Sequence, residues 1–477
     1  MPFQLPADCL NEIFEYLEKD KASLYSCLLV NRLWCEISVR ILWRDIWTTK
    51  PVTHGRRRLK VNPTILNTFI TCLPNNSKTH LLKKGILNST QISKTPLFDY
   101  ASFCKVLSIN EVGQTIIDIF KNQKYLAKEI MKMFMAKTSL KKLSYYSDPN
   151  TINLSFLRYP GAKDYLTKLS KLSCSSSIKS KFFYKLSQIS CNIQSLSIEF
   201  KDIISDDLKI LISSQNNLKY LSLIQYNNTD WRDIIPSLVK HSNTLIKLKL
   251  FLRKFCRIGQ LSFITKLTNL QELVLLFRYN YHFDEINSKL QYITFPHLQV
   301  LKFPCAYPDH DMLIKFLENN GKNLKEFYIF SSDDSLNLAI AKFCPNLISL
   351  YTLFRNDKIE TFKVILNSCQ QLESFETHCN YELLSEKELL GALAKYSPKN
   401  FYRLKLSLAN YLLDSRLVSE DLEDFPTNWK NRVPQKSFSF IIRGCTRSSE
   451  TKEKYMSMVE KYKKLGINIR FDFSCYN

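Results

Sequence analysis

The side chains that most often catalyse reactions or bind metals are scattered along this sequence of 477 residues. The seven histidines stand at positions 54, 80, 241, 282, 297, 310 and 378, and no two of them have the helical spacing of metal ligands. None of the 14 cysteines belongs to a Cys-x-x-Cys pair. We therefore predict no catalytic residue, no metal site and no cofactor.

Adjacent carboxylates are the next candidates for chemistry, and they occur at Asp206-Asp207 and Asp333-Asp334. Each pair stands at an expected turn or helix start, where an aspartate side chain accepts hydrogen bonds from free backbone N–H groups. The sequence has only 9 glycines and shows no phosphate-binding loop and no Gly-x-Ser-x-Gly motif. The pattern therefore favours a protein that binds other molecules over an enzyme.

The charge of the chain is strongly positive, with 67 lysines and arginines against 44 acidic residues, or +23. Such an excess favours acidic partners, and Arg56, Arg57, Arg58 and Lys60 form a basic run inside an expected linker. One hypothesis is therefore a basic scaffold that binds nucleic acid or an acidic surface.

Targeting and membrane signals are missing from the sequence. No run of about 18 apolar residues could span a membrane. The first residues lack the pattern of a signal peptide. We expect the cysteines to be reduced thiols and the protein to work in the cytoplasm or the nucleus.

The stretch Leu5–Trp47 predicts a small bundle of three helices. Pro6 suits a first helical position, Asp20 suits the cap of a second helix, and Asn31 interrupts before a third. An apolar stripe follows Pro6 with the i, i+3, i+4, i+7 spacing of a helix, at Leu10, Ile13, Phe14 and Leu17. So short a bundle cannot bury all of its apolar surface, and part of that surface should face a partner.

This stretch resembles the F-box, the module that docks onto Skp1 in cullin-based ubiquitin ligases. The resemblance rests on the Leu-Pro pair at residue 5, on the stripe that follows it, and on Val30, Trp34 and the Leu42-Trp43 pair. It implies that a Skp1-like adaptor contacts Leu5, Pro6, Leu10, Ile13, Phe14, Leu17, Val30 and Trp34.

From about residue 100 the sequence repeats. The pattern apolar-x-x-apolar-x-apolar recurs every 23 to 29 residues, beginning at Ile193, Leu218, Leu245, Leu270, Leu298, Leu324, Leu347, Leu372 and Phe401. Weaker copies begin at Cys104, Leu140 and Leu169, and two final strands are expected near Phe438–Ile442 and Ile467–Phe473. Helix-like stretches lie between the strands, at Asp206–Ser214, Trp231–His241, Met312–Asn319, Ile359–Asn367 and Glu386–Tyr396.

This period and pattern resemble the leucine-rich repeat, in which stacked units share one core. The resemblance implies an α/β fold, a solenoid with a curved parallel sheet and outer helices. We expect an F-box over residues 1–47, a linker with intermediate helices over 48–100, and the solenoid over 101–477. The family's asparagine position after each strand is Asn only at Asn380, so no continuous asparagine ladder is expected there.

Residues that alternate with the apolar strand positions should line the concave face. This register predicts a substrate-binding surface of Tyr220, Phe251, Leu276, Tyr328, Phe330 and Tyr351, extended by Ile224, Val274 and Leu353. It also places charges of both signs on that face, at Lys247, Lys249, Glu272, Lys302, Glu326, Glu376, Arg403 and Lys405, and His378 could face the same side. An apolar centre among mixed charges favours a protein target over nucleic acid.

The two resemblances together imply a non-catalytic substrate receptor of a Skp1-cullin-F-box ubiquitin ligase. Its partners would be a Skp1-like adaptor, the cullin ligase and a protein substrate. Two alternatives stay open, namely the basic scaffold and an F-box protein that acts with Skp1 outside a ligase.

Overall fold

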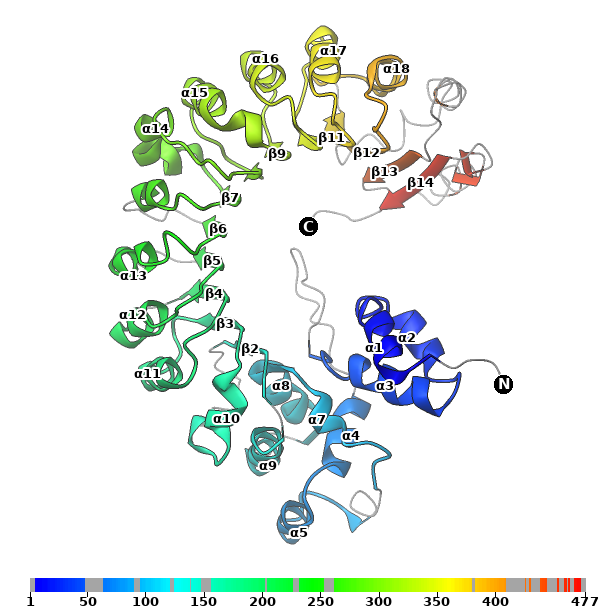
Figure 1. Ribbon diagram of the computed structural model, residues 1–477, viewed down its shortest axis with the longest axis vertical. Coiled ribbons are helices and arrows are strands. Elements are labelled where there is room, and N and C mark those ends of the chain that lie inside the picture. Colours follow the sequence, from blue (N-terminus) through cyan, green and yellow to red (C-terminus); the bar gives the residue numbers. More distant parts are fainter. Residues whose placement is uncertain are drawn as a thin grey trace. The chain divides into compact units, whose positions relative to one another are not determined.

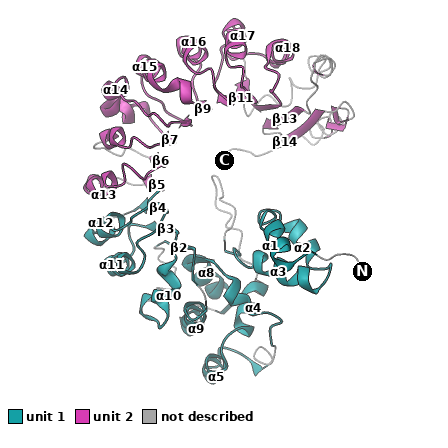
Figure 2. Ribbon diagram, in the orientation of Figure 1, with its two compact units in different colours: residues 1–219 teal, residues 220–477 magenta. Residues whose placement is uncertain are grey.

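The computed structural model describes residues 5–47, 63–89, 95–120, 124–137, 139–146, 156–201, 204–225, 231–252, 261–379, 382–408, 438–443 and 467–472, with isolated positions between 425 and 463. The chain divides into two compact units, Met1–Lys219 and Tyr220–Asn477 (Figure 2). The predicted linker Thr48–Pro63, with its basic run, lies outside the described residues except for its last position.

The first unit begins with three short helices, α1 (Ala7–Glu15), α2 (Lys21–Cys27) and α3 (Arg32–Leu42). Pro6, predicted as the first helical residue, lies one position before α1. The predicted cap at Asp20 is confirmed, because its carboxylate accepts a hydrogen bond from the Ser23 N–H. Asn31 caps α3 by accepting from the Trp34 N–H at 2.9 Å. Polar side chains thus satisfy the free N–H groups that open α2 and α3.

In the described residues, further helices follow this bundle before and among the first repeats. They are α4 (Pro63–Thr71), α5 (Asn75–Lys83), α7 (Tyr100–Phe103), α8 (Ile109–Phe120) and α9 (Lys124–Met135). Phe69 on α4 is fully buried. Its ring stacks on Trp47 and makes edge contacts with Trp43 and Phe134. An apolar core therefore continues from the end of the three-helix bundle into α9.

The strands of the first unit are β1 (Val106–Ser108), β2 (Lys142–Tyr145), β3 (Lys171–Ser175) and β4 (Ser195–Phe200). They pair in parallel and in chain order, from β1 to β4. The elements that connect β2, β3 and β4 and follow β4 are η1 (Phe156–Arg158), α10 (Ala162–Thr167), α11 (Ser180–Ile189) and α12 (Asp206–Ser213).

The second unit continues the same alternation. Its strands are β5 (Tyr220–Gln225), β6 (Lys247–Leu252), β7 (Glu272–Phe277), β8 (Val300–Phe303), β9 (Glu326–Ile329), β10 (Ser349–Tyr351), β11 (Ser374–Cys379), β12 (Arg403–Leu408), β13 (Phe438–Arg443) and β14 (Ile467–Asp472). Its helices are η2 (Arg232–Ile234), α13 (Ile235–Val239), η3 (Leu261–Lys266), η4 (Asn280–Phe283), α14 (Asp284–Leu290), α15 (His310–Asn320), η5 (Gly321–Asn323), α16 (Asp334–Phe343), α17 (Ile359–Ser368) and α18 (Glu386–Tyr396). Within this unit the strands line the inner side of a curve and helices α14 to α18 the outer side (Figure 1).

The predicted fold class is confirmed, because the described part of the chain forms a parallel sheet of 14 strands in chain order. Each predicted copy of the repeat supplies a strand, and both predicted final strands are present. The registers place leucines such as Leu248, Leu273 and Leu301 side by side in adjacent strands. Stacking of such rows buries an apolar face that one repeat could not bury by itself.

Buried amide side chains join neighbouring repeats at the ends of helices. The side-chain oxygen of Asn320 accepts from the Phe295 N–H at 2.6 Å, and its amide donates to the Ile293 and Phe316 carbonyls. Gln215 makes the same kind of bridge, from the Ile193 N–H to the Ser190 carbonyl. These side chains satisfy backbone groups that the strands leave free.

Asparagines that directly precede the strand leucines form a second set of bridges. Asn269 donates to the Asn243 carbonyl at 2.6 Å, Asn323 to Pro296 at 3.0 Å, and Asn346 to Lys322 at 2.9 Å. The sequence lacks a ladder at the position usual for leucine-rich repeats, and these asparagines connect repeats at the opposite ends of the strands.

Replacing Asn320 by alanine is expected to destabilise the second unit by about 2–4 kcal/mol, because the Phe295 N–H and the Ile293 carbonyl would be buried without partners. The matched control is Asn323→Ala, which removes one exposed hydrogen bond and should cost about 0.5–1 kcal/mol. Urea denaturation of both variants measures the difference. Equal midpoints for the two variants would contradict the role assigned to Asn320.

Candidate protein-binding surfaces

The three-helix bundle has its own apolar core. Leu10, Phe14, Leu24, Ile37 and Ile41 are buried together. The Phe14 ring also meets Trp34 edge to face, with ring centroids 4.9 Å apart. Helix α1 therefore turns one apolar side toward α2 and α3.

Two residues predicted to contact a Skp1-like adaptor are buried inside the bundle. Leu10 and Phe14 are only 3% and 2% exposed, and their contact with an adaptor stays a prediction. Three helices of this length need their largest apolar groups for their own core, and these two side chains fill it. Leu17 and Trp34 are half-buried and pack against the same core.

The remaining predicted residues of the bundle do reach solvent. Leu5, Pro6, Ile13 and Val30 are exposed. Sequence reasoning missed three exposed neighbours of these residues in the bundle, Tyr16, Tyr25 and Leu29, of which Leu29 is 89% exposed. Helix α2 ends at Cys27, so Leu29 falls in a turn where helical spacing does not predict burial. We call Leu5, Ile13, Tyr16, Leu29 and Val30 the bundle's exposed apolar set.

An ion pair fastens α1 to the end of α3. The two terminal nitrogens of Arg44 each bond a Glu15 oxygen at 2.6 Å, and one of them also reaches Glu18 at 3.2 Å. The hydrogen bond from Arg44 holds the pKa of Glu15 below its usual value. Such a bidentate pair fixes direction as well as distance, and it holds the helix that carries Ile13 in place.

The predicted alternation of the concave strands is confirmed. In β5, β6 and β7 every second residue is buried and those between are half-buried or exposed. Tyr220 and Phe330 are exposed, and Phe251, Leu276 and Tyr328 are half-buried. Their role in binding a substrate stays a prediction.

Tyr351 is a correction to the predicted surface. It is 2% exposed, and Leu353 is buried beside it in a small cluster with Leu383. The ring of Tyr328 stacks on Tyr351 with centroids 3.8 Å apart and nearly parallel planes. Tyr351 therefore supports this part of the face from below and does not itself reach solvent.

The aromatic cluster extends to Phe330 and His378. The His378 ring meets Phe330 and Tyr351 edge to face, at 5.4 and 5.8 Å. Burial lowers the pKa of His378, although the nearby Glu376 charge opposes this shift. His378 is therefore a neutral ring near pH 7 and adds to an apolar surface, whose exposed member is Phe330 at 42%.

Charged pairs flank this cluster, as the register predicted. Lys302 bonds Glu326 at 2.7 Å, and Glu376 holds both Lys405 at 3.2 Å and Arg443 at 3.1 Å. Glu272 likewise binds Lys247 and Lys249. Burial would raise the pKa of Glu272, but the hydrogen bond from Lys247 and the charge of Lys249 outweigh it, so this carboxylate stays ionised.

The expected capping roles of the paired aspartates are partly confirmed. Asp333 caps α16 by accepting from the Leu336 N–H at 2.8 Å. At the other pair Ser205 is the cap of α12, and Asp206 lies in its first turn. Within the described ranges no group of three histidine, cysteine or acidic side chains could hold a metal ion. Burial raises the pKa of Cys104 and Cys174 to about 12, so these thiols are poor nucleophiles.

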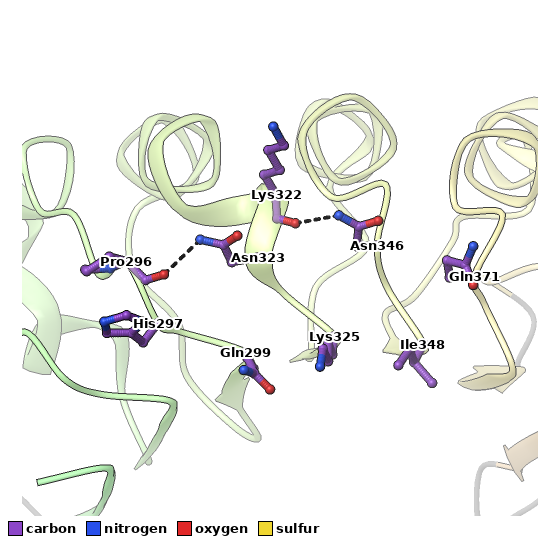
Figure 3. Close-up of a pocket in the computed structure, with 9 residues that line it drawn as sticks. All are labelled: Pro296, His297, Gln299, Lys322, Asn323, Lys325, Asn346, Ile348 and Gln371. Carbon is purple, nitrogen blue, oxygen red and sulfur yellow. Dashed lines mark hydrogen bonds between the residues drawn. The ribbon is translucent and has the colours of Figure 1, made fainter.

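An open pocket of about 380 Å³ lies beside the strand starts of β8, β9 and β10 in the second unit. Figure 3 shows the Asn323 and Asn346 hydrogen bonds crossing it from repeat to repeat, while the Lys322 side chain extends away from Gln299 and Lys325. The lining thus includes the two asparagines that bridge neighbouring repeats. We therefore interpret this pocket as a gap between stacked repeats and not as a ligand site.

Comparison with known proteins identifies the N-terminal bundle. Residues 3–49 match the F-box-like family. No match was found among curated proteins. The chain therefore carries an N-terminal F-box-like region, followed by a long parallel sheet with helices that is consistent with a leucine-rich-repeat solenoid.

The chain is also similar to two solved structures. The leucine-rich repeat-containing protein LegL7 from Legionella pneumophila is 15% identical, with a TM-score of 0.35, over 64% of this chain and 96% of that one. A chain from the Rad7 and Elc1 complex of yeast is 14% identical, with a TM-score of 0.37, over 93% of this chain and 94% of that one.

Among the residues that the structure describes, no helix is long and apolar enough to cross a membrane.

Proposed function

We propose that this protein is the substrate receptor of a Skp1-cullin-F-box ubiquitin ligase. The observation that carries the proposal is the F-box-like match at residues 3–49 on a bundle that leaves its exposed apolar set in solvent. Isolated surface leucines are common, but several large apolar side chains on one bundle of this size mark a docking surface. The proposed partner of this surface is a Skp1-like adaptor.

The concave face of the second unit is the proposed substrate site. It offers Phe330 above the stacked Tyr328 and Tyr351, and it carries charged groups of both signs. Aromatic anchors surrounded by polar groups are the usual composition of a protein-binding surface. A segment of a target protein is the occupant we propose.

The receptor itself would form no covalent bond. Holding a target near a ubiquitin-conjugating enzyme raises the local concentration of acceptor lysines, which is catalysis by proximity. Such a ligase works inside the cell, and we propose the cytoplasm or the nucleus as the compartment.

Co-purification with a Skp1-like adaptor and a cullin tests this function. The full chain should retain both proteins. Retention of the adaptor without a cullin would support an F-box protein that acts outside a ligase. Failure to retain the adaptor at all would refute the proposal.

Replacing Phe330 by aspartate is expected to reduce capture of the target at least about tenfold, because a central aromatic anchor becomes a charge. The matched control is Tyr292→Asp, which changes an exposed tyrosine that lies outside the strands. Quantitative mass spectrometry measures the amount of target captured by each variant under proteasome inhibition. The amount of captured adaptor serves as the internal standard. Equal losses of target in the two variants would contradict a concave substrate site.

A further inference from the structure

A second pocket lies in the first unit, and its lining contains no residue of the exposed apolar set. Its volume is about 480 Å³, and its lining comes from β2, η1, α11 and the residues just before α11. The lining residues are Tyr145, Phe156, Leu157, Arg158, Ile178, Lys179, Ser180, Lys181, Phe182 and Lys185. This volume lies within the range of pockets that hold small organic molecules.

The floor of this pocket is aromatic. The rings of Tyr145, Phe156 and Phe182 form a triangle with centroids 5.2 to 6.0 Å apart, and each pair meets edge to face. Phe156 and Phe182 are buried, which fixes the position of the floor. Ile178 and Leu157 add aliphatic surface. A flat apolar group is the natural occupant of such a floor.

The rim of the pocket is basic. Arg158, Lys179, Lys181 and Lys185 are all exposed there, and none of the four forms an ion pair with any residue that the structure describes. One carboxylate reaches the lining, since Asp207 accepts a hydrogen bond from the Ser180 hydroxyl. The local charge is therefore 4 − 1 = +3.

This balance differs from that of the concave face. On the concave face, Glu272, Glu326 and Glu376 each form an ion pair with one or two lysines or arginines. Part of the positive charge of that face is therefore compensated. At the pocket the four cations share no such partner in the described ranges, although they lie close enough to line one cavity. Like charges gathered beside an apolar floor repel one another, and a bound anion relieves that repulsion.

We propose that this pocket binds a small organic anion with an aromatic ring, the ring lying on Tyr145, Phe156 and Phe182 and the anionic group facing the lysines. The proposal does not depend on the ligase function, because none of its residues belongs to the exposed apolar set or to the concave strands of the second unit. It gives the chain a small-molecule site in addition to its protein surfaces.

Titration of the full chain with 1-anilinonaphthalene-8-sulfonate tests the proposal. This dye joins aromatic rings to a sulfonate and fluoresces when it leaves water. We expect saturable binding at low salt, weakened when salt screens the rim charges. The neutral analogue N-phenyl-1-naphthylamine and the ring-free methanesulfonate should each bind at least about tenfold more weakly, because each lacks one half of the recognition.

Charge reversal locates the site. Lys181→Glu combined with Lys185→Glu should weaken the saturable dye binding at least about tenfold, since two attractive charges become repulsive. The matched control, Lys163→Glu with Lys168→Glu, makes the same change in net charge at exposed lysines outside the lining. Circular dichroism checks that all variants are folded.

The outcomes are distinct. Loss of the saturable binding in the lining variant alone supports the proposal. An equal loss of saturable dye binding in the control variant overturns the proposal. Unchanged dye binding in the lining variant overturns it as well. Dye bound to the exposed apolar set would persist in both variants, so it cannot imitate the expected result.

Discussion

Replacing Ile13 and Val30 together by aspartate is expected to weaken binding of a Skp1-like adaptor by at least about 100-fold. Each exposed aliphatic side chain that a partner buries contributes about 1.5–3 kcal/mol, and each new carboxylate must also lose its water. Both positions are exposed here, so the bundle should remain folded. Surface plasmon resonance with purified adaptor measures the change.

The controls for this experiment separate contact from folding. Tyr184→Asp alters an exposed aromatic residue on α11, outside the bundle, and should leave adaptor binding unchanged. Leu10→Ala should also lose binding, but through a different cause, because truncating a buried leucine costs about 2–5 kcal/mol of stability. Wild-type affinity in the double aspartate variant would remove the exposed apolar set from the adaptor interface.

Replacing Gly161 by alanine is expected to destabilise the first unit by about 2–5 kcal/mol. Gly161 precedes α10 with φ +81°, a left-handed conformation that residues with a Cβ rarely adopt. A Cβ there would also collide with the Met135 carbonyl oxygen at the end of α9. The Gly161 backbone cannot shift without disturbing α10, and the Met135 backbone cannot shift without disturbing α9. The cost of backbone strain and the cost of overpacking therefore add.

The comparison variant is Gly391→Ala. Gly391 lies inside α18, and a Cβ there would meet no atom within 4 Å. Alanine should stabilise this helix by about 1 kcal/mol, because it loses less backbone freedom than glycine on folding. Amide hydrogen exchange should show faster exchange in α9 and α10 for the first variant and slower exchange in α18 for the second. Unchanged exchange around α10 would rule out the strain argument.

The sequence by itself determined the repeats and their strands. A parallel sheet aligns equivalent residues of successive repeats, so the spacing of 23 to 29 residues is preserved as a visible period. The limits of several helices were predicted almost as well. The predicted helix Glu386–Tyr396 has those limits in the structure, where Ser385 and Glu388 form a capping box at its start.

Only the tertiary structure decided which apolar side chains face inward. Helical spacing placed Leu10, Ile13 and Phe14 on one stripe, but packing against α2 and α3 buries the first and last and leaves Ile13 in solvent. Alternation along the strand likewise placed Tyr351 outside, whereas stacking with Tyr328 and the cluster around Leu383 bury it. Local periodicity indicates the direction in which a side chain leaves its own backbone. Whether that side chain is buried depends on which other parts of the chain pack against it.

The basic pocket of the first unit had no signal in the sequence for the same reason. Tyr145, Phe156 and Phe182 belong to three different elements, and Lys181 and Lys185 look like an ordinary solvated helix face. Folding of β2, η1 and α11 against one another brings the rings together below the lysines. The sequence shows which residue types are present, but only the packing of the repeats brings these residues together in one pocket.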